Sequence, residues 1–206
     1  MNIERVIAYV DGFNLYFGLK EAGWRRYYWV DIKKLVTRLL KENQRLIVTK
    51  YFTARISGPP DKQKRQSIFL EALSTLTDFK IYYGHYLSNT ITCNKCGRNW
   101  LDFEEKMTDV NIATEMLTDA FEDKFDTAIL ISADSDLVPP IRTIKRIYPR
   151  KRIVVFFPPR RFSTHIKNSA DIQLSIGRGS LVKSQFPDRV RKSDGVILEK
   201  PLEWQL

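Results

Sequence analysis

The sequence contains few of the residues that build disulfide frameworks or histidine-rich metal sites. It has two cysteines and two histidines among 206 residues, and the cysteines, Cys93 and Cys96, lie close together. A disulfide framework is therefore excluded, and a reducing compartment fits the composition better than a secreted location. No apolar run reaches about 18 residues, so the sequence predicts no membrane-spanning helix.

A secretory signal is missing as well. The N-terminal residues MNIERVIAYVDGF include an acid, Glu4, and no cleavable apolar segment. We therefore expect a cytoplasmic protein with no membrane partner.

Acidic residues are the minority among the charges. The chain has 34 Lys and Arg against 24 Asp and Glu, which gives a net charge of +10. This balance favours a polyanionic partner, and nucleic acid is favoured over a membrane surface because no segment has the pattern of a basic amphipathic anchor. Hydrophobic residues make up 43% of the sequence, which is typical of a globular protein with a core.

Strand-like and helix-like patterns alternate along most of the chain. The strand patterns lie at residues 5–10, 45–54, 79–87, 127–132, 152–157 and 170–176, and the helical patterns at 31–41, 61–76, 107–122, 138–148 and 162–170. This alternation predicts an α/β domain with a mostly parallel sheet of five or six strands and helices on both faces. The apolar rhythm weakens afterwards, so residues 177–206 are expected to be a tail or a small appendage.

Four aspartates lie at or near the expected strand ends. Asp11 follows the first strand, Asp134 and Asp136 follow the strand at 127–132, and Asp109 lies in the first turn of the helix before it. Ligands of open parallel sheets bind at the carboxyl ends of the strands. Carboxylates that converge there repel one another unless a cation neutralises them, and oxygen ligands select Mg²⁺ or Mn²⁺.

Each aspartate also has a purely structural interpretation. Asp11, Asp109 and Asp136 stand at or near the start of helical patterns, where Asp stabilises exposed backbone N–H groups. Their convergence at one edge, beside Asn14 and Ser132, favours the metal site over separate helix caps.

Three motifs in this order resemble the NYN domain family of the PIN-like nuclease superfamily: YVDGFNLYFGL, EKMTDVNIATEM and LISADSDLVPPI. The resemblance implies a Rossmann-like, three-layer PIN-like sandwich over residues 1–176, and metal-dependent cleavage of RNA phosphodiesters. The end of the chain, FPDRVRKSDGVILEKPLEW, also resembles some bacterial members but suggests no chemistry.

The resemblance further implies roles for single residues. Asp11, Asp109 and Asp134 would be the catalytic metal ligands, and Asp136 would be a ligand or would support one. Asn14 would contact metal-bound water or substrate. A bound Mg²⁺ or Mn²⁺ would activate water and stabilise charge on the attacked phosphate.

Basic and aromatic residues are interleaved at residues 23–30, 142–152 and 158–167. This mixture holds phosphates and stacks unpaired bases, so it favours single-stranded RNA, although solvated charges and buried aromatics explain each stretch equally well. Lys106, just before Asp109, is a further candidate for contacting phosphate, or else a solvated lysine. The full set of candidate substrate contacts is Asn14, Lys106, Ser132, Arg150, Lys151, Arg152, Arg160 and Arg161.

Cys93 and Cys96 form a CxxC followed by glycine, within an insertion at about residues 88–103. A structural zinc ion takes four ligands. A closed site in one chain would need His85 plus an acid, whereas a second CxxC from a partner subunit would make a homo-oligomer. An inert hairpin is the equal alternative, and a redox motif is less favoured.

Two other functions compete with a ribonuclease. The DSD sequence imitates the nucleophile motif of haloacid-dehalogenase-like phosphatases, but that motif normally begins the chain. The second alternative is a non-catalytic RNA-binding or adaptor protein that keeps the fold. Retention of Asp11, Asp109 and Asp134 argues against it.

Overall fold

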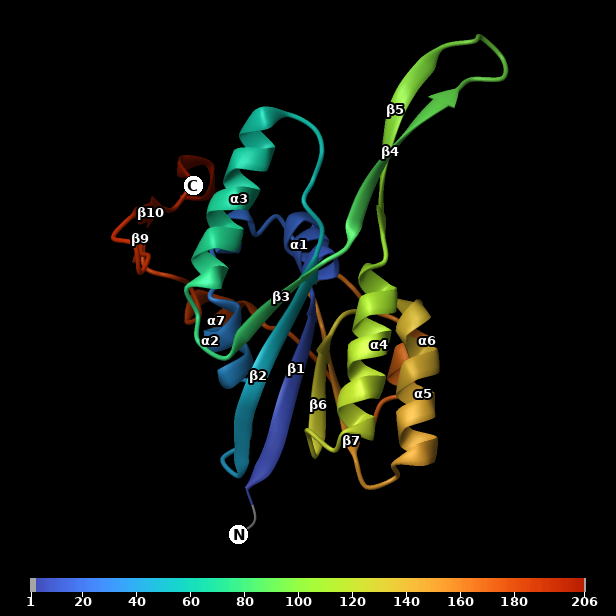
Figure 1. The fold of residues 1–206 in the computed structure, drawn as a ribbon, viewed down its shortest axis with the longest axis vertical. Coiled ribbons are helices and arrows are strands. Elements are labelled where there is room, and N and C mark those ends of the chain that lie inside the picture. Colours follow the sequence, from blue (N-terminus) through green and yellow to red (C-terminus); the bar gives the residue numbers. More distant parts are fainter. Residues whose placement is uncertain (1–2, 206) are drawn as a thin grey trace.

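A computed structural model describes residues 3–205 and has a central sheet of six parallel strands (Figure 1). The strand order is β3-β2-β1-β6-β7-β8. The strands are β1 (Glu4–Asp11), β2 (Gln44–Thr53), β3 (Phe79–Tyr83), β6 (Thr127–Ile131), β7 (Arg152–Phe157) and β8 (Ile172–Ser175). The predicted α/β fold with a parallel sheet is confirmed.

Helices cover both faces of this sheet, because alternate side chains of the inner strands enter two separate cores. In β1, Val6, Ala8 and Val10 face one core, while Ile7 and Tyr9 face the other. The first core is covered by α1 (Gly12–Glu21), α2 (Ile32–Thr37), α3 (Pro60–Ser74) and α7 (Arg178–Val182), and the second by α4 (Thr108–Phe121), α5 (Val138–Ile147) and α6 (Thr164–Lys167). The result is a three-layer sandwich.

Short-range signals explain where several helices begin. Asp31 caps α2, since its Oδ1 accepts the Lys34 N–H at 2.8 Å, and α3 and α5 carry prolines in their first turns. The helix predicted at 31–41 is shorter and ends at Thr37. From the sequence, the helix at Gly12–Glu21 was considered only as a helix that Asp11 could cap, and no range was predicted for it.

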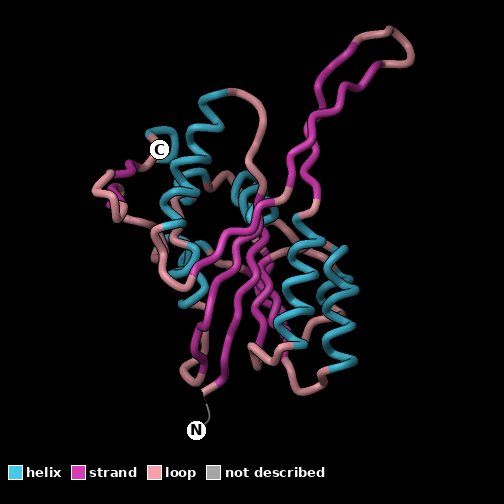
Figure 2. The backbone as a smooth tube through the Cα atoms, in the orientation of Figure 1, coloured by secondary structure: helices cyan, strands magenta, loops and turns pink. Residues whose placement is uncertain are grey.

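The strand predicted at 79–87 is interrupted at Gly84, whose N–H donates to the Thr53 carbonyl at 2.8 Å. The chain then leaves the sheet as an antiparallel hairpin of β4 (His85–Thr92) and β5 (Asn99–Lys106), which projects from the body (Figure 2). The inserted segment is thus longer than the predicted 88–103.

The segment after Gly177 folds against the body. After α7 it forms β9 (Arg189–Arg191), β10 (Ile197–Glu199) and a 3-10 turn, η3 (Leu202–Trp204). Phe186, Val190, Leu198 and Trp204 are buried in the same core as α1 and α3, so this is a packed appendage. Within residues 3–205, no helix has the length and apolar character needed to cross a membrane.

Candidate active site

β1 and β6 are neighbouring parallel strands, so their carboxyl ends lie side by side. Val10 pairs with Ile131, and the next residue of each strand is polar and buried: Asp11 and Ser132. The Ser132 hydroxyl donates to Asp11 Oδ2 at 2.9 Å and accepts the Asp134 N–H at 3.0 Å. We call the region of Asp11, Ser132 and Asp134 the acid edge.

Asn14 links the two strand ends a second time. Its backbone N–H donates to Asp11 Oδ1 at 2.9 Å, and its side-chain Oδ1 accepts the Ala133 N–H at 3.1 Å. The beginning of α1 is therefore fixed to the loop that follows β6. Asp11, Asn14, Ser132 and Asp134, all predicted as site residues, come together here.

Two of these aspartates also cap helices. Asp11 caps α1 through Asn14, and Asp134 caps the short turn η2 (Ser135–Leu137) by accepting the Asp136 N–H at 3.0 Å. Each carboxylate oxygen offers two lone pairs, so a capping aspartate keeps capacity for another ligand. The structural role and the metal-binding role are compatible.

The other two predicted acids lie at the same edge. Asp109 is in the first turn of α4, which packs against β1 and η2, and Asp136 is exposed in η2. Lys106 is an exposed residue at the end of β5, just before α4. Among the side chains that the structure describes, no three His, Cys, Asp or Glu residues gather in a way that could hold a metal ion. A metal site shared by all four predicted carboxylates stays a prediction.

The acid edge nevertheless suits a hard divalent ion. Asp11, Ser132 and Asp134 present only oxygen donors, the kind of ligand that Mg²⁺ and Mn²⁺ prefer. Mg²⁺ commonly uses one or two carboxylates and completes its octahedral shell with water and substrate phosphates. The two carboxylates at the strand ends fit that mode of binding.

The predicted basic contacts at β7 lie at opposite ends of this strand, some at its carboxyl end and some at its amino end. Arg160 and Arg161 follow β7 and so lie at the acid edge. Their loop packs closely on α1 at Gly18, where an added Cβ would lie 2.6 Å from the Pro159 carbonyl oxygen. Arg161 forms an ion pair with Glu21, and Arg160 is exposed. Arg160 is the one of this pair whose position suits a phosphate.

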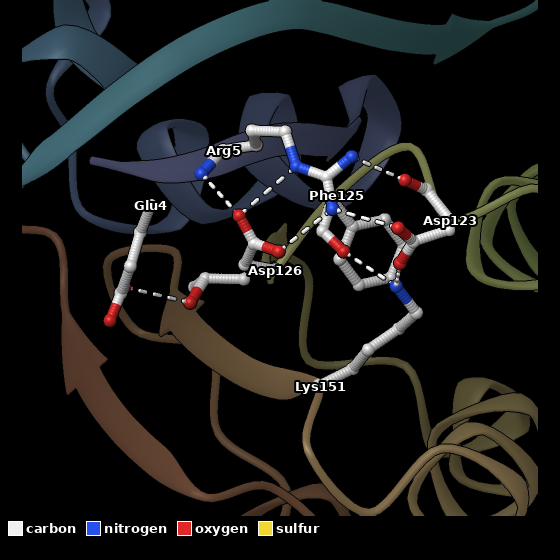
Figure 3. A network of polar contacts seen from close by, with 7 residues as sticks. Glu4, Arg5, Asp123, Phe125, Asp126 and Lys151 are labelled. Carbon is white, nitrogen blue, oxygen red and sulfur yellow. Dashed lines mark hydrogen bonds and ion pairs between the residues drawn. The ribbon is translucent and has the colours of Figure 1, made fainter. Parts of the chain in front are cut away.

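Arg150, Lys151 and Arg152 lie at the other end of β7 and do not adjoin the acid edge. The buried Lys151 ammonium donates to Asp123 Oδ1 at 2.5 Å and to the Phe125 carbonyl at 2.7 Å (Figure 3). Lys151 therefore has a structural role. A basic run in a sequence does not reveal at which end of a strand it will stand.

The network in Figure 3 also helps to align the strands that form the site. The Arg5 guanidinium donates to both oxygens of Asp126, at 2.8 and 3.1 Å, and joins the start of β1 to the residue before β6. Hydrogen bonds from Arg5 lower the pKa of Asp126, and the hydrogen bond from Lys151 does most to lower the pKa of Asp123. The β1–β6 pair is thus held at its far end.

A cavity of about 510 Å³ opens beside Gly12, between α1, α3 and the C-terminal turn. Its size is within the usual range for small-molecule sites. Six aromatic residues line it: Phe13, Tyr16, Tyr28, Tyr51, Phe69 and Trp204. Four basic residues also line it: Lys20, Arg25, Lys62 and Arg65. We call this the aromatic cavity.

The aromatic cavity combines neutral rings with positive charge. The Tyr16 and Tyr28 rings lie 5.0 Å apart, and Tyr28 meets Trp204 edge-on at 5.7 Å. Burial raises the pKa of Tyr28 to about 12, and burial together with the Asp11 charge raises that of Tyr51. These phenols therefore stay protonated at neutral pH.

Sequence reasoning missed most of this cavity. Arg25 and Tyr28 belong to the basic and aromatic stretch at 23–30, which it did select. Tyr16 and Phe13 fall in a motif that was considered only for Asp11 and Asn14. Trp204 comes from the end of the chain, for which no role was assigned.

The two cysteines lie at the tip of the β4–β5 hairpin and are unoxidised. Backbone N–H groups of Lys95 and Cys96 donate to the Cys93 sulfur and lower the pKa of its thiol. His85 begins β4 at the base of the hairpin, and His165 lies on α6. The structure therefore does not place His85 beside the cysteines.

Comparisons with known proteins agree with this architecture. The NYN domain model matches residues 5–177. The chain is 28% identical to 6-hydroxy-3-succinoylpyridine 3-monooxygenase of Pseudomonas putida over 97% of this chain and 75% of that protein. It is 26% identical to an uncharacterised protein of Methanocaldococcus jannaschii, over 84% and 74% of the two chains.

A solved structure supports the fold alone. A protein of unknown function from Vibrio parahaemolyticus superposes with a TM-score of 0.57 at 20% identity, covering 90% of this chain and 98% of that one. The family match covers most of the chain, including both strands of the acid edge. The chain therefore belongs to the NYN domain family, whose members are nuclease-like domains.

Proposed function

We propose that this protein is a Mg²⁺- or Mn²⁺-dependent endoribonuclease that cleaves unpaired RNA at the acid edge. The main support is the position of Asp11 and Asp134 at the ends of neighbouring strands, where the Ser132 hydroxyl joins the Asp11 carboxylate to the Asp134 backbone N–H. Family membership supports a nuclease, and the net charge of +10 suits a polyanionic substrate.

In this proposal each residue of the acid edge has a defined task. Asp11 and Asp134 would hold the divalent ion, which when bound supplies an activated water and stabilises charge on the phosphate. Ser132 orients Asp11 by donating to its Oδ2, and Asn14 fixes the loop that carries Asp134. Their hydrogen bonds restrict the carboxylates before substrate arrives.

The remaining acids and bases would act around the substrate. Asp109 and Asp136 would contact the ion directly or through its water molecules. Lys106 and Arg160 are exposed at the same edge and would contact phosphates on either side of the scissile bond. These contacts would set the position of the RNA.

The aromatic cavity would hold a base of the bound strand. It begins at Gly12, the residue after Asp11, so a strand with its scissile phosphate at the acid edge passes its opening. Aromatic rings stack any base, and Arg25 or Lys62 would contact the phosphate beside it. Because duplex bases cannot enter such a cavity, the substrate would be single-stranded.

A cleavage assay tests the proposed function. Purified protein is expected to cut an unstructured RNA internally with Mg²⁺ or Mn²⁺, to be inactive with a chelator, and to cut the same sequence poorly when it is paired with its complement. Cleavage that is unaffected by chelation, or no cleavage of any RNA with either metal, would contradict the proposal.

Substitution of Tyr16 tests the aromatic cavity. Tyr16 is 42% exposed, so its removal should leave the fold intact. Tyr16→Ala is expected to weaken binding of unstructured RNA by about 5- to 150-fold. This range corresponds to the free energy of about 1–3 kcal/mol that stacking of one base on an aromatic ring contributes. Binding is measured by fluorescence anisotropy without divalent ions, so that cleavage does not interfere.

The matched control is Phe121→Ala. Phe121 is an exposed aromatic at the end of α4, outside the cavity. Its removal should leave RNA affinity unchanged. If both variants bind like the parent protein, the base does not enter the cavity.

A second candidate function is binding of a small heteroaromatic acid. The aromatic cavity with its basic residues favours it, and the Pseudomonas putida relative is named for a pyridine substrate. Thermal shifts with a pyridine carboxylate and with a nucleoside monophosphate separate the two readings. A non-catalytic RNA-binding protein is the other alternative, and the capping roles of Asp11 and Asp134 favour it. Metal-dependent cleavage in the assay above would exclude this alternative, and RNA binding without cleavage would support it.

A further inference from the structure

The β4–β5 hairpin extends away from the folded body as a paired arm (Figures 1 and 2). Its register runs from His85 opposite Lys106 to Thr92 opposite Asn99. At about 3.3 Å per residue, the turn at the end lies roughly 25 Å from the base. Whatever the turn binds must therefore come largely from outside this chain.

The turn that carries Cys93 and Cys96 is closed by its own backbone hydrogen bonds. The Cys93 N–H donates to the Arg98 carbonyl and the Gly97 N–H donates to the Cys93 carbonyl, both at 2.8 Å. Gly97 has φ +68°, a conformation that glycine adopts without strain. N–H groups of Lys95 and Cys96 point to the Cys93 sulfur, which orients it as outer hydrogen bonds orient metal ligands.

The described residues supply no second pair of ligands near the turn. A structural zinc ion takes four ligands, usually thiolates or imidazoles. The sequence has no further cysteine, and its histidines are at the arm's base and on α6. Within the described part of the chain, no third residue joins Cys93 and Cys96 to complete a metal group.

We propose that Cys93 and Cys96 of two copies of this protein bind one zinc ion between the ends of their hairpin arms. A two-fold axis through the ion makes the two half-sites identical, and four thiolates give the tetrahedral shell that zinc prefers. The proposal does not depend on the ribonuclease function.

Charge complementarity supports a second copy as the partner. Zinc with four thiolates carries two negative charges in excess, and each turn has two exposed cations, Lys95 and Arg98. Two turns thus place four cations around a site with two excess negative charges, which more than neutralises it. Without the metal, the same four cations repel one another, so the arms should separate.

The test uses the full chain purified with zinc and a reducing agent. We expect about half an equivalent of zinc per chain and a molar mass by light scattering of twice that of the chain. A chelator should remove the zinc and give monomers, and returning zinc should restore the dimer. One zinc per monomer, no bound zinc, or a dimer that survives chelation would overturn the proposal.

Two variants make the assignment specific. Cys93→Ser with Cys96→Ser should lose both zinc and dimer, while the temperature of unfolding of the body stays unchanged because no residue of the turn belongs to either described core. Asn94→Ser alters the same turn without removing a sulfur and should keep both. Replacing zinc with Co²⁺ gives an absorption spectrum that reports how many thiolates bind the ion. A spectrum that indicates fewer than four thiolates would overturn the shared site.

Discussion

Asp11→Asn is expected to reduce metal-dependent RNA cleavage by about 100-fold or more while the protein remains folded. In the proposed function the charge of Asp11 holds the divalent ion, whereas asparagine still caps a helix about as well as aspartate. In the structure the Asp11 oxygens accept hydrogen bonds from the Asn14 N–H and the Ser132 hydroxyl, and an amide keeps one acceptor. We therefore expect the free energy of unfolding to change by about 1 kcal/mol at most.

The matched control is Asp31→Asn. Asp31 caps α2 through the same contact, an Oδ1 that accepts the N–H three residues later, but it is not one of the acid-edge residues and does not line the aromatic cavity. Its activity and stability should both stay close to those of the parent. Asp134→Asn should behave like Asp11→Asn. If all three variants cleave like the parent, the acid edge is only a pair of helix caps.

Lys50→Met is expected to destabilise the protein by about 3–5 kcal/mol, the usual cost of leaving a buried charge unpaired. Lys50 is 4% exposed, and its ammonium pairs with Asp119 and with Glu115 at 2.6 Å, both on α4. Asp119 is fully buried and would keep the Tyr9 hydroxyl at 2.7 Å, while the half-exposed Lys124 ammonium stays 3.6 Å from its Oδ1 and offsets part of the charge. Chemical denaturation measures the loss.

A double substitution tests whether the unpaired charge is the cause. Adding Asp119→Asn removes that charge but keeps an acceptor for Tyr9, so the double variant should be more stable than Lys50→Met alone. Lys33→Met is the surface control: Lys33 pairs with the exposed Asp78 at 3.3 Å, and its loss should cost about 1 kcal/mol or less. Equal losses for Lys50 and Lys33 would refute the buried-charge explanation.

The sequence predicted the elements of the sheet because their patterns are local. Strands such as TAILI at 127–131 are continuously apolar, as parallel strands buried on both faces must be. The interruption of the strand at Gly84 could not be predicted from local patterns, because it depends on a hydrogen bond to Thr53 in another strand. The extent of the hairpin arm was therefore underestimated.

The site was predictable in part. Acids that end strands could be found along the chain, and the pairing of β1 with β6 then placed Asp11 beside Ser132. Side-chain direction was not predictable, since it depends on which backbone N–H each carboxylate accepts. The same limit applies to Lys151, whose buried contacts with Asp123 and Phe125 come from a distant loop.

Trp204, in the wall of the aromatic cavity, has a consequence for the order in which the protein matures during synthesis. Translation proceeds from the N-terminus, and domains begin to fold as they emerge. A nascent chain that has emerged through β8 already contains every strand of the sheet and both aspartates of the acid edge. It still lacks the tryptophan that lines the cavity. A ribosome-bound chain would thus have its acidic pair well before the wall of the aromatic cavity is complete.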